Sequence, residues 1–144
     1  MQVMAKHHSI AGQRGLTLEP QLDPALPPVT VDVELMREVI TRLLDNALNY
    51  TPRDGAVTII TATHQQVDFT WVTLTVKDTG PGILPEELPR LFDRFYRGAA
   101  TRNYTIPGVG LSLPICLSIV GKLGGRITVE SEPEQGASFT VWLK

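Results

Sequence analysis

Residues 78–83 read Asp78-Thr79-Gly80-Pro81-Gly82-Ile83. The preceding residues 72–77 alternate apolar and polar side chains, which is the period of a half-buried β-strand. A carboxylate therefore stands where a strand ends, directly before a turn. The two glycines of that turn let the backbone approach a flat ligand without an intervening Cβ atom. Taken alone, these residues fit a structural turn and the edge of a ligand site equally well, so the neighbouring segments have to decide between them.

The composition indicates one folded domain. With 144 residues, of which 42% are hydrophobic, the chain is long enough to bury a core. Its net charge of −2 argues against general nucleic-acid binding. No apolar run approaches a membrane span and the start has no signal-peptide pattern, so we expect a cytoplasmic protein without membrane contact from this part. The lone cysteine, Cys116, excludes an internal disulfide and a cysteine zinc site, and is expected in the core.

Residue patterns along the chain predict a two-layer α/β sandwich. Alternating or β-branched stretches predict extended segments around residues 16–22, 29–33, 56–64, 69–77, 126–131 and 137–143. Helical spacing predicts a long helix beginning at about Asp32 and another over residues 111–122, and Pro85 marks the start of a short helix. Residues 1–15 show no apolar periodicity. We expect them to be a poorly ordered boundary or the end of a preceding helix, with residues 16–144 forming the domain.

The first long helix carries a polar stripe, defined as Arg42, Asn46 and Asn49, whose i, i+4, i+7 spacing places them on one face. Asparagine is a mediocre helix former, so two on one stripe invite an explanation. They are either exposed amides near the end of the helix or the source of an amide oxygen for Mg²⁺. That cation takes oxygen ligands and keeps several waters when it is bound with phosphates.

Two downstream features favour phosphate binding. Four of the thirteen basic residues fall between Arg90 and Arg102, among small and polar residues that suit a mobile basic loop. Gly108 and Gly110 precede the second long helix, where backbone N–H groups and the helix dipole attract phosphate. The sequence has neither a Walker-type lysine motif nor a Rossmann fingerprint. A nucleotide would therefore bind in another way.

Four motifs, in order and suitably spaced, resemble the ATP-binding catalytic domain of two-component sensor histidine kinases, in the superfamily shared with gyrase, Hsp90 and MutL. They are an N box at Leu43–Pro52, a G1 box at Asp78–Ile83, an F box at Leu91–Arg97 and a G2 box at Gly108–Leu113. The resemblance covers about residues 16–144. It implies the Bergerat fold, an α+β sandwich with a mixed, largely antiparallel five-stranded sheet packed against three helices.

The resemblance also implies a role for individual residues. Asn46 would hold Mg²⁺ and would form the catalytic set with Arg42 and Arg97. Asp78 would accept a hydrogen bond from the adenine amino group. The whole ATP-binding set implied in this way is Asn46, Asn49, Tyr50, Asp78, Gly80, Gly82, Ile83, Tyr96, Arg97, Gly108, Val109, Gly110, Leu111 and Ser112.

Some positions depart from the family pattern. Arg42 stands where the kinases commonly have asparagine and the ATPases have glutamate, which leaves no evident base to activate water for ATP hydrolysis. Asn49 stands where a lysine is frequent, which removes one phosphate contact that Arg42 could replace. Val109 and Ser112 replace a commonly hydroxylated residue and a third glycine in the G2 box.

The function that the resemblance implies is that of a protein-histidine kinase. The domain would bind ATP and Mg²⁺ between the two long helices, under a lid at residues 90–107. It would transfer the γ-phosphoryl group to a histidine on a separate dimerisation domain, for relay to a response regulator. His7, His8 and His64 lack the sequence context of the family's phosphoacceptor, so we expect a catalytic fragment of a kinase that could be membrane-anchored elsewhere. The alternatives are a degenerate nucleotide-binding module of this superfamily and an anti-sigma-type serine kinase.

Overall fold

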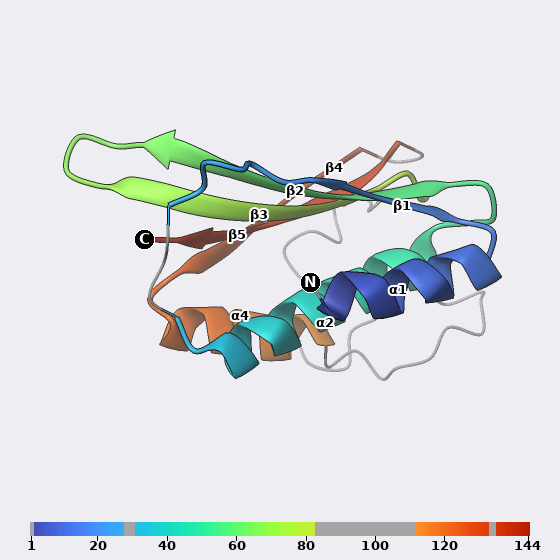
Figure 1. Cartoon of the computed structure of the whole chain (residues 1–144), viewed down its shortest axis with the longest axis horizontal. Coiled ribbons are helices and arrows are strands. Elements are labelled where there is room, and N and C mark those ends of the chain that lie inside the picture. Colours follow the sequence, from blue (N-terminus) through green and yellow to red (C-terminus); the bar gives the residue numbers. More distant parts are fainter. Residues whose placement is uncertain (1, 28–30, 83–111, 133–134) are drawn as a thin grey trace.

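The helices and the sheet form two layers (Figure 1). The computed structural model describes residues 2–27, 31–82, 112–132 and 135–144. In these ranges, helices α1 (Gln2–Gln13), α2 (Val33–Tyr50) and α4 (Ser112–Lys122) cover one face of a five-stranded sheet. The predicted α+β sandwich is therefore confirmed. Within the same ranges, no helix combines the length and the apolar character needed to cross a membrane.

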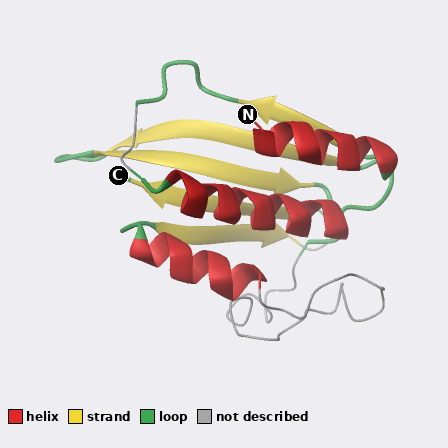
Figure 2. Ribbon diagram, turned by 60° about the horizontal axis from the view of Figure 1, so that its bottom comes forward, coloured by secondary structure: helices red, strands yellow, loops and turns green. Residues whose placement is uncertain are grey.

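The sheet is mixed and largely antiparallel, as predicted. Its strands are β1 (Thr17–Gln21), β2 (Ala56–Gln65), β3 (Thr70–Asp78), β4 (Arg126–Glu132) and β5 (Gly136–Leu143). Their order across the sheet is β1-β2-β3-β5-β4. Strand β1 pairs with β2 in parallel, whereas the other neighbours are antiparallel. A parallel pair needs a crossover connection, and α2 supplies it. Figure 2 shows the three helices lying side by side across the sheet.

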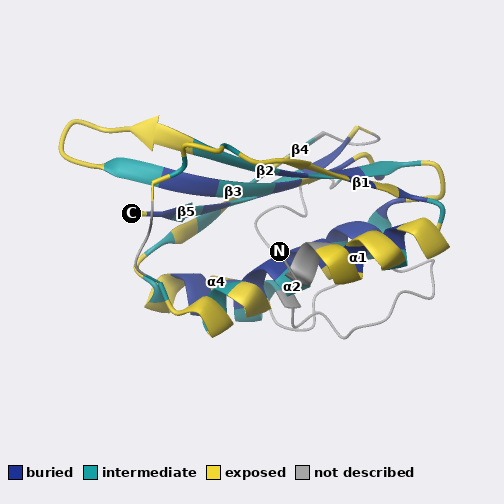
Figure 3. Cartoon of the chain, in the orientation of Figure 1, coloured by how far each residue is buried: buried dark blue, intermediate teal, exposed yellow. Residues whose placement is uncertain are grey.

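Helix α2 is fixed between a defined start and the core. At its N-cap, the Asp32 carboxylate accepts hydrogen bonds from the backbone N–H groups of Glu34 at 2.9 Å and Leu35 at 3.1 Å. The buried face of α2, visible in Figure 3, consists of Val39, Ile40, Leu43, Leu44, Ala47 and Leu48. Burial of each larger side chain contributes about 1.5–3 kcal/mol. This anchoring also fixes the direction of the polar stripe on another face of the helix.

Cys116 is a core residue of α4, as predicted. Its side chain is fully buried, and its Sγ lies 3.9 Å from the carbonyl oxygen of Val39 in α2. Burial raises the pKa of the Cys116 thiol to about 12. The thiol is therefore protonated at neutral pH and serves the packing of α4 against α2.

The N-terminal segment differs from the prediction of a poorly ordered boundary. Gln2–Gln13 form α1, and Ala11 of this helix is buried in the core. His7 is fully buried, and its Nε2 lies 2.7 Å from Oδ1 of Asp45 on α2. Helix α1 is thus packed onto α2 by both an apolar and a polar contact. Of the two expectations for residues 1–15, the end of a helix is closer to the observed structure than a poorly ordered boundary.

A second difference concerns residues 29–33, where alternating valines predict a short strand. Val33 is instead the first residue of α2, and Val31 lies in irregular structure directly before the N-cap. The cap at Asp32 satisfies two backbone N–H groups, which favours a helix start over a strand at this point. Val29, the short helix predicted at Pro85 and the basic loop predicted over residues 90–104 lie outside the described residues.

Candidate nucleotide-binding site

The end of α2, the end of β3 and the start of β2 meet at one end of the domain. The backbone N–H of Thr79 donates to the carbonyl oxygen of Ala56 at 3.1 Å, and Thr79 Oγ1 accepts from the N–H of Ala56 at 3.0 Å. The next residue, Gly80, lies so close to α2 that an added Cβ atom would stand 2.8 Å from the carbonyl oxygen of Tyr50. Glycine is therefore needed for the loop after β3 to press against the last residue of α2.

Asp78 is a buried carboxylate at the last position of β3, with 5% of its surface exposed. Its Oδ1 accepts a hydrogen bond from the backbone N–H of Gly80 at 2.9 Å, and the N–H of Ala137 is a second donor to the carboxylate. Burial raises the pKa of the Asp78 carboxyl above its ordinary value, while these two N–H groups oppose the shift. A buried carboxylate held by fixed donors is suited to accept a hydrogen bond from a ligand.

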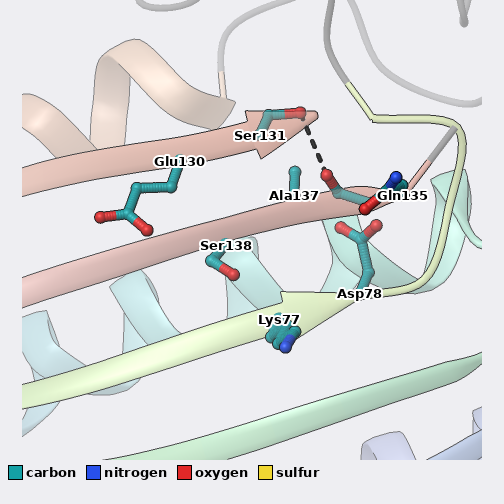
Figure 4. A pocket seen from close by; sticks show the side chains of 8 residues that line it. Lys77, Asp78, Glu130, Ser131, Gln135, Ala137 and Ser138 are labelled. Atoms are coloured by element: carbon teal, nitrogen blue, oxygen red, sulfur yellow. Dashed lines mark hydrogen bonds between the residues drawn. The ribbon is translucent and has the colours of Figure 1, made fainter. Parts of the chain in front are cut away.

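A polar cavity of about 360 Å³ opens at this end of the sheet (Figure 4). Its lining consists of Lys77, Asp78, Glu130, Ser131, Gln135, Gly136, Ala137 and Ser138. The Ser131 hydroxyl donates to the carbonyl oxygen of Gly136 at 3.1 Å, which joins the ends of β4 and β5. Because successive strand residues face opposite sides, Lys77 points away from the helices whereas Asp78 lies on the helix side. The cavity thus has lining residues from both faces of the sheet end, and Asp78 is one of them.

Gly136 is required where β5 passes Asp78. Its φ is +96°, and an added Cβ atom would overlap the carbonyl oxygen of Asp78. We expect Gly136→Ala to destabilise the domain by about 2 kcal/mol, because both the backbone conformation and the space favour glycine. Thermal unfolding followed by circular dichroism measures this loss. The control is Gly121→Ala in α4, where an added Cβ atom meets nothing within 4 Å. Equal melting temperatures for Gly136→Ala and wild type would contradict the prediction.

The polar stripe exists as predicted, but its members have different surroundings. Arg42 donates from Nε to Oε1 of Glu38 at 2.7 Å, so its charge is paired within α2. Asn49 accepts at Oδ1 from Nη1 of Arg14 at 2.8 Å. Asn46 is half-buried, and its side chain has no hydrogen-bond partner among the described residues. Among the described residues, Asn46 is therefore the member of the stripe whose amide oxygen has no partner.

The remaining predicted site residues are only partly described. Gly82 follows in the loop after β3, with a φ of +75°. Ser112 begins α4, and only its backbone is described. The residues that lie outside the described ranges are Ile83, Tyr96, Arg97, Gly108, Val109, Gly110 and Leu111. The structure thus brings Tyr50, Asp78 and Gly80 together.

Sequence reasoning missed two contributors to this end of the domain. The first is the start of β5, where Ala137 donates its N–H to Asp78 and Gly136 passes close to it. The second is Arg14, which reaches Asn49 from the end of α1. Gly136 is the sequence signal that could have indicated the first of these contributors, because a glycine at the start of a strand indicates a close approach of another backbone segment.

Comparison with known protein families identifies the family of this chain. A family profile described as Histidine kinase-, DNA gyrase B-, and HSP90-like ATPase matches residues 31–144. The chain belongs to this ATPase family. Membership of this family supports ATP as the nucleotide of the domain.

Curated relatives of this ATPase-family domain are sensor kinases. Sensor histidine kinase Hik2 of Synechocystis sp. (strain ATCC 27184 / PCC 6803 / Kazusa) is 38% identical over 151 residues, which cover 99% of this chain and 35% of Hik2. Adaptive-response sensory kinase SasA of Synechococcus sp. (strain CC9311) is 42% identical over 128 residues, covering 88% of this chain and 32% of SasA. The chain spans about a third of the length of these relatives, whose homology supports the histidine-kinase branch of the family.

Solved structures agree with this assignment. The mycobacterial sensor histidine kinase MprB aligns with a TM-score of 0.79 at 28% identity, covering 99% of this chain and 93% of that one. Full-length ShkA, solved in complex with AMPPNP, aligns with a TM-score of 0.84 at 27% identity, covering 99% of this chain and 28% of that one. The described elements therefore have the fold of histidine kinase catalytic domains.

Proposed function

We propose that this domain binds ATP with Mg²⁺ and donates the γ-phosphoryl group to a histidine on a separate dimerisation domain. A response regulator would receive the group from that histidine. The observation that carries the proposal is the buried Asp78 carboxylate, held by the N–H of Gly80 at 2.9 Å beside the end of α2. Membership of the ATPase family and the homology to sensor kinases support it. The proposed site of action is the cytoplasm, where ATP is available.

Asp78 selects the base in this proposal. Its carboxylate accepts a hydrogen bond from the amino group of adenine, whereas guanine would present a carbonyl oxygen at that place and repel the carboxylate. Gly80 keeps the loop close to Tyr50, so that the loop and the end of α2 form adjacent walls for the purine. The phosphates then extend toward Asn46 on α2.

The donor set fits Mg²⁺ bound together with phosphates. Asn46 offers one amide oxygen that has no other partner among the described residues. The described part of the chain holds no group of three or more His, Cys, Asp or Glu side chains that could hold a metal. Such a site suits a cation that takes its other oxygens from phosphates and water. When bound, Mg²⁺ supplies charge neutralisation to the phosphates, and Asn46 orients them.

Two of the three histidines of this chain, His7 and His64, are held in contacts that fit a phosphoacceptor on another domain. His7 is fully buried against Asp45 and has no access to a nucleotide. The His64 ring packs 5.0 Å from the ring of Trp142, at a point of β2 remote from Asp78 in the β2–β3 pairing. Phosphoryl transfer requires an acceptor in line with the γ-phosphate. A separate domain that docks at the Asp78 end of the fold can provide one.

Calorimetry with Mg·ATP tests the binding step. We expect binding with a Kd between about 1 μM and 1 mM, and clear preference over Mg·GTP. Absence of binding would overturn the kinase proposal in favour of a degenerate module. Transfer from γ-labelled ATP to the separate dimerisation domain tests the chemistry. Label that is lost in acid and stable in base identifies phosphohistidine, whereas acid-stable label would favour the serine-kinase alternative.

A further inference from the structure

Arg14 occupies a fixed place beside the polar stripe, because the packing of α1 determines where its backbone lies. The N–H of Arg14 donates to the carbonyl oxygen of Ile10 at 3.1 Å, which continues the α1 hydrogen-bond pattern. The N–H of Leu16 donates to the carbonyl oxygen of Ala11 at 2.9 Å, and Ala11 is buried in the core. The contact between His7 and Asp45 holds α1 along α2. The backbone at Arg14 is therefore held in place by the hydrogen bonds at the end of α1 and by the packing of this helix.

The Arg14 guanidinium lies near the C-terminal end of α2, where Asn46 and Asn49 are found. Its Nη1 donates to Oδ1 of Asn49 at 2.8 Å. Asn49 follows Asn46 by three residues, and side chains with that spacing are neighbours on a helix surface, with about 5–6 Å between their Cβ atoms. Asn49, which the guanidinium contacts, thus lies about one helical turn from Asn46, the residue to which the proposed function assigns the phosphates.

The charge of Arg14 is not neutralised by the described residues. In those ranges no carboxylate lies within ion-pair distance of it, whereas Arg37 pairs with Glu34 at 2.8 Å and Arg42 pairs with Glu38 at 2.7 Å. Arg14 is also exposed, so its other N–H groups are open to a ligand. A guanidinium has five donors in a fixed fork that matches phosphate oxygens, and its bond to Asn49 uses one of its two terminal nitrogens.

We propose that Arg14 binds the phosphate chain of the nucleotide and that Asn49 is the residue that positions its guanidinium. The inference rests on the proposed function, since it adds a residue to the same site. From the sequence we expected Arg42 to replace the phosphate contact that is lost where Asn49 stands in place of a lysine. In the structure, however, Arg42 forms an ion pair with Glu38. Arg14 is the basic residue that the structure places against Asn49. A segment outside the four sequence motifs therefore completes the phosphate end of the site.

The test compares nucleotides that differ only in their phosphates. Calorimetry gives the Kd of Mg·ATP, Mg·ADP and AMP for the wild type, Arg14→Gln and Arg14→Lys. We expect Arg14→Gln to weaken Mg·ATP by about five- to twentyfold and AMP by less than twofold, because the β- and γ-phosphates carry most of the charge. Arg14→Lys should recover most of the loss, and the effect should shrink as salt concentration rises. Arg37→Gln is the matched control and should change nothing.

Each outcome decides the proposal. Equal Mg·ATP affinity of Arg14→Gln and wild type would overturn it while leaving the proposed function standing. An equal loss for Mg·ATP and AMP would also overturn it, since that pattern indicates loosened packing of α1. Failure of the wild type to bind Mg·ATP would remove the proposed function and this inference together. Thermal unfolding of each variant accompanies the titrations, and an exposed side chain at position 14 predicts melting temperatures close to wild type.

Discussion

Asp78→Asn is expected to weaken ATP binding at least tenfold. A hydrogen bond to a charged group contributes about 1.5–3 kcal/mol, and about 1.4 kcal/mol corresponds to a factor of ten in affinity. Asparagine keeps an oxygen that can accept from the N–H of Gly80, so the fold should survive. Calorimetry with Mg·ATP measures the loss, and Asp68→Asn in the exposed β2–β3 turn is the control. Wild-type affinity in Asp78→Asn would show that this carboxylate does not recognise the base.

The raised pKa of Asp78 adds a pH dependence to this prediction. Binding of adenine needs the carboxylate, so wild-type affinity should fall on acidification, beginning at a higher pH than for an ordinary aspartate. The stability of the nucleotide-free protein should respond in the opposite direction. Because the folded state holds the Asp78 proton more tightly than the unfolded chain, this group contributes stability at low pH that is lost as pH rises through its folded pKa. Asp78→Asn should lack both dependences.

Asn46→Ala is expected to reduce phosphoryl transfer by about a hundredfold or more without loss of stability. The Asn46 side chain has no hydrogen-bond partner among the described residues, and alanine is the better helix former. The proposed reason for the lost transfer is that the variant lacks the amide oxygen that would hold Mg²⁺ and orient the phosphates. The measurement is transfer from labelled ATP to the separate dimerisation domain, with thermal unfolding in parallel.

A binding experiment separates this role from a general effect on the site. ATP affinity should be higher in Mg²⁺ than in EDTA for the wild type, and Asn46→Ala should lose that difference while matching the wild type in EDTA. Arg37→Ala, in the first turns of α2 and paired there with Glu34, serves as the control. If Asn46→Ala kept the full effect of Mg²⁺, the assignment of Asn46 to the cation would fail.

The parts of the fold that sequence predicted are those with local signals. Strand β3 ends at Asp78 within one residue of the prediction, because alternation and the glycine turn are both local. The start of α2 follows from the capping preference of Asp32. The pair of Glu38 and Arg42 has i, i+4 spacing, so its formation was also open to prediction from sequence.

The missed parts depend on contacts between distant positions. His7 and Asp45 are 38 residues apart, and Arg14 and Asn49 are 35 residues apart, so no local pattern connects them. The ordered packing of helix α1 was not predicted for this reason, since its contacts with α2 are what make it ordered. At residues 29–33 two local signals disagreed. The alternating valines predicted a strand, which was wrong, because the N-cap at Asp32 starts helix α2 there. The position of Asp78 at a strand end was predicted from sequence, but the β5 backbone that holds it depends on sheet register.

The parallel pairing of β1 with β2 determines how the domain can be shortened. The family profile begins at residue 31, yet β1 at Thr17–Gln21 forms one outer edge of the sheet and α1 packs against it. A protein started at residue 31 would expose the unpaired backbone edge of β2, which is a template for aggregation, and would uncover the side of α2 that carries Asp45. The smallest self-sufficient unit is therefore longer at its N-terminus than the region that the family profile covers.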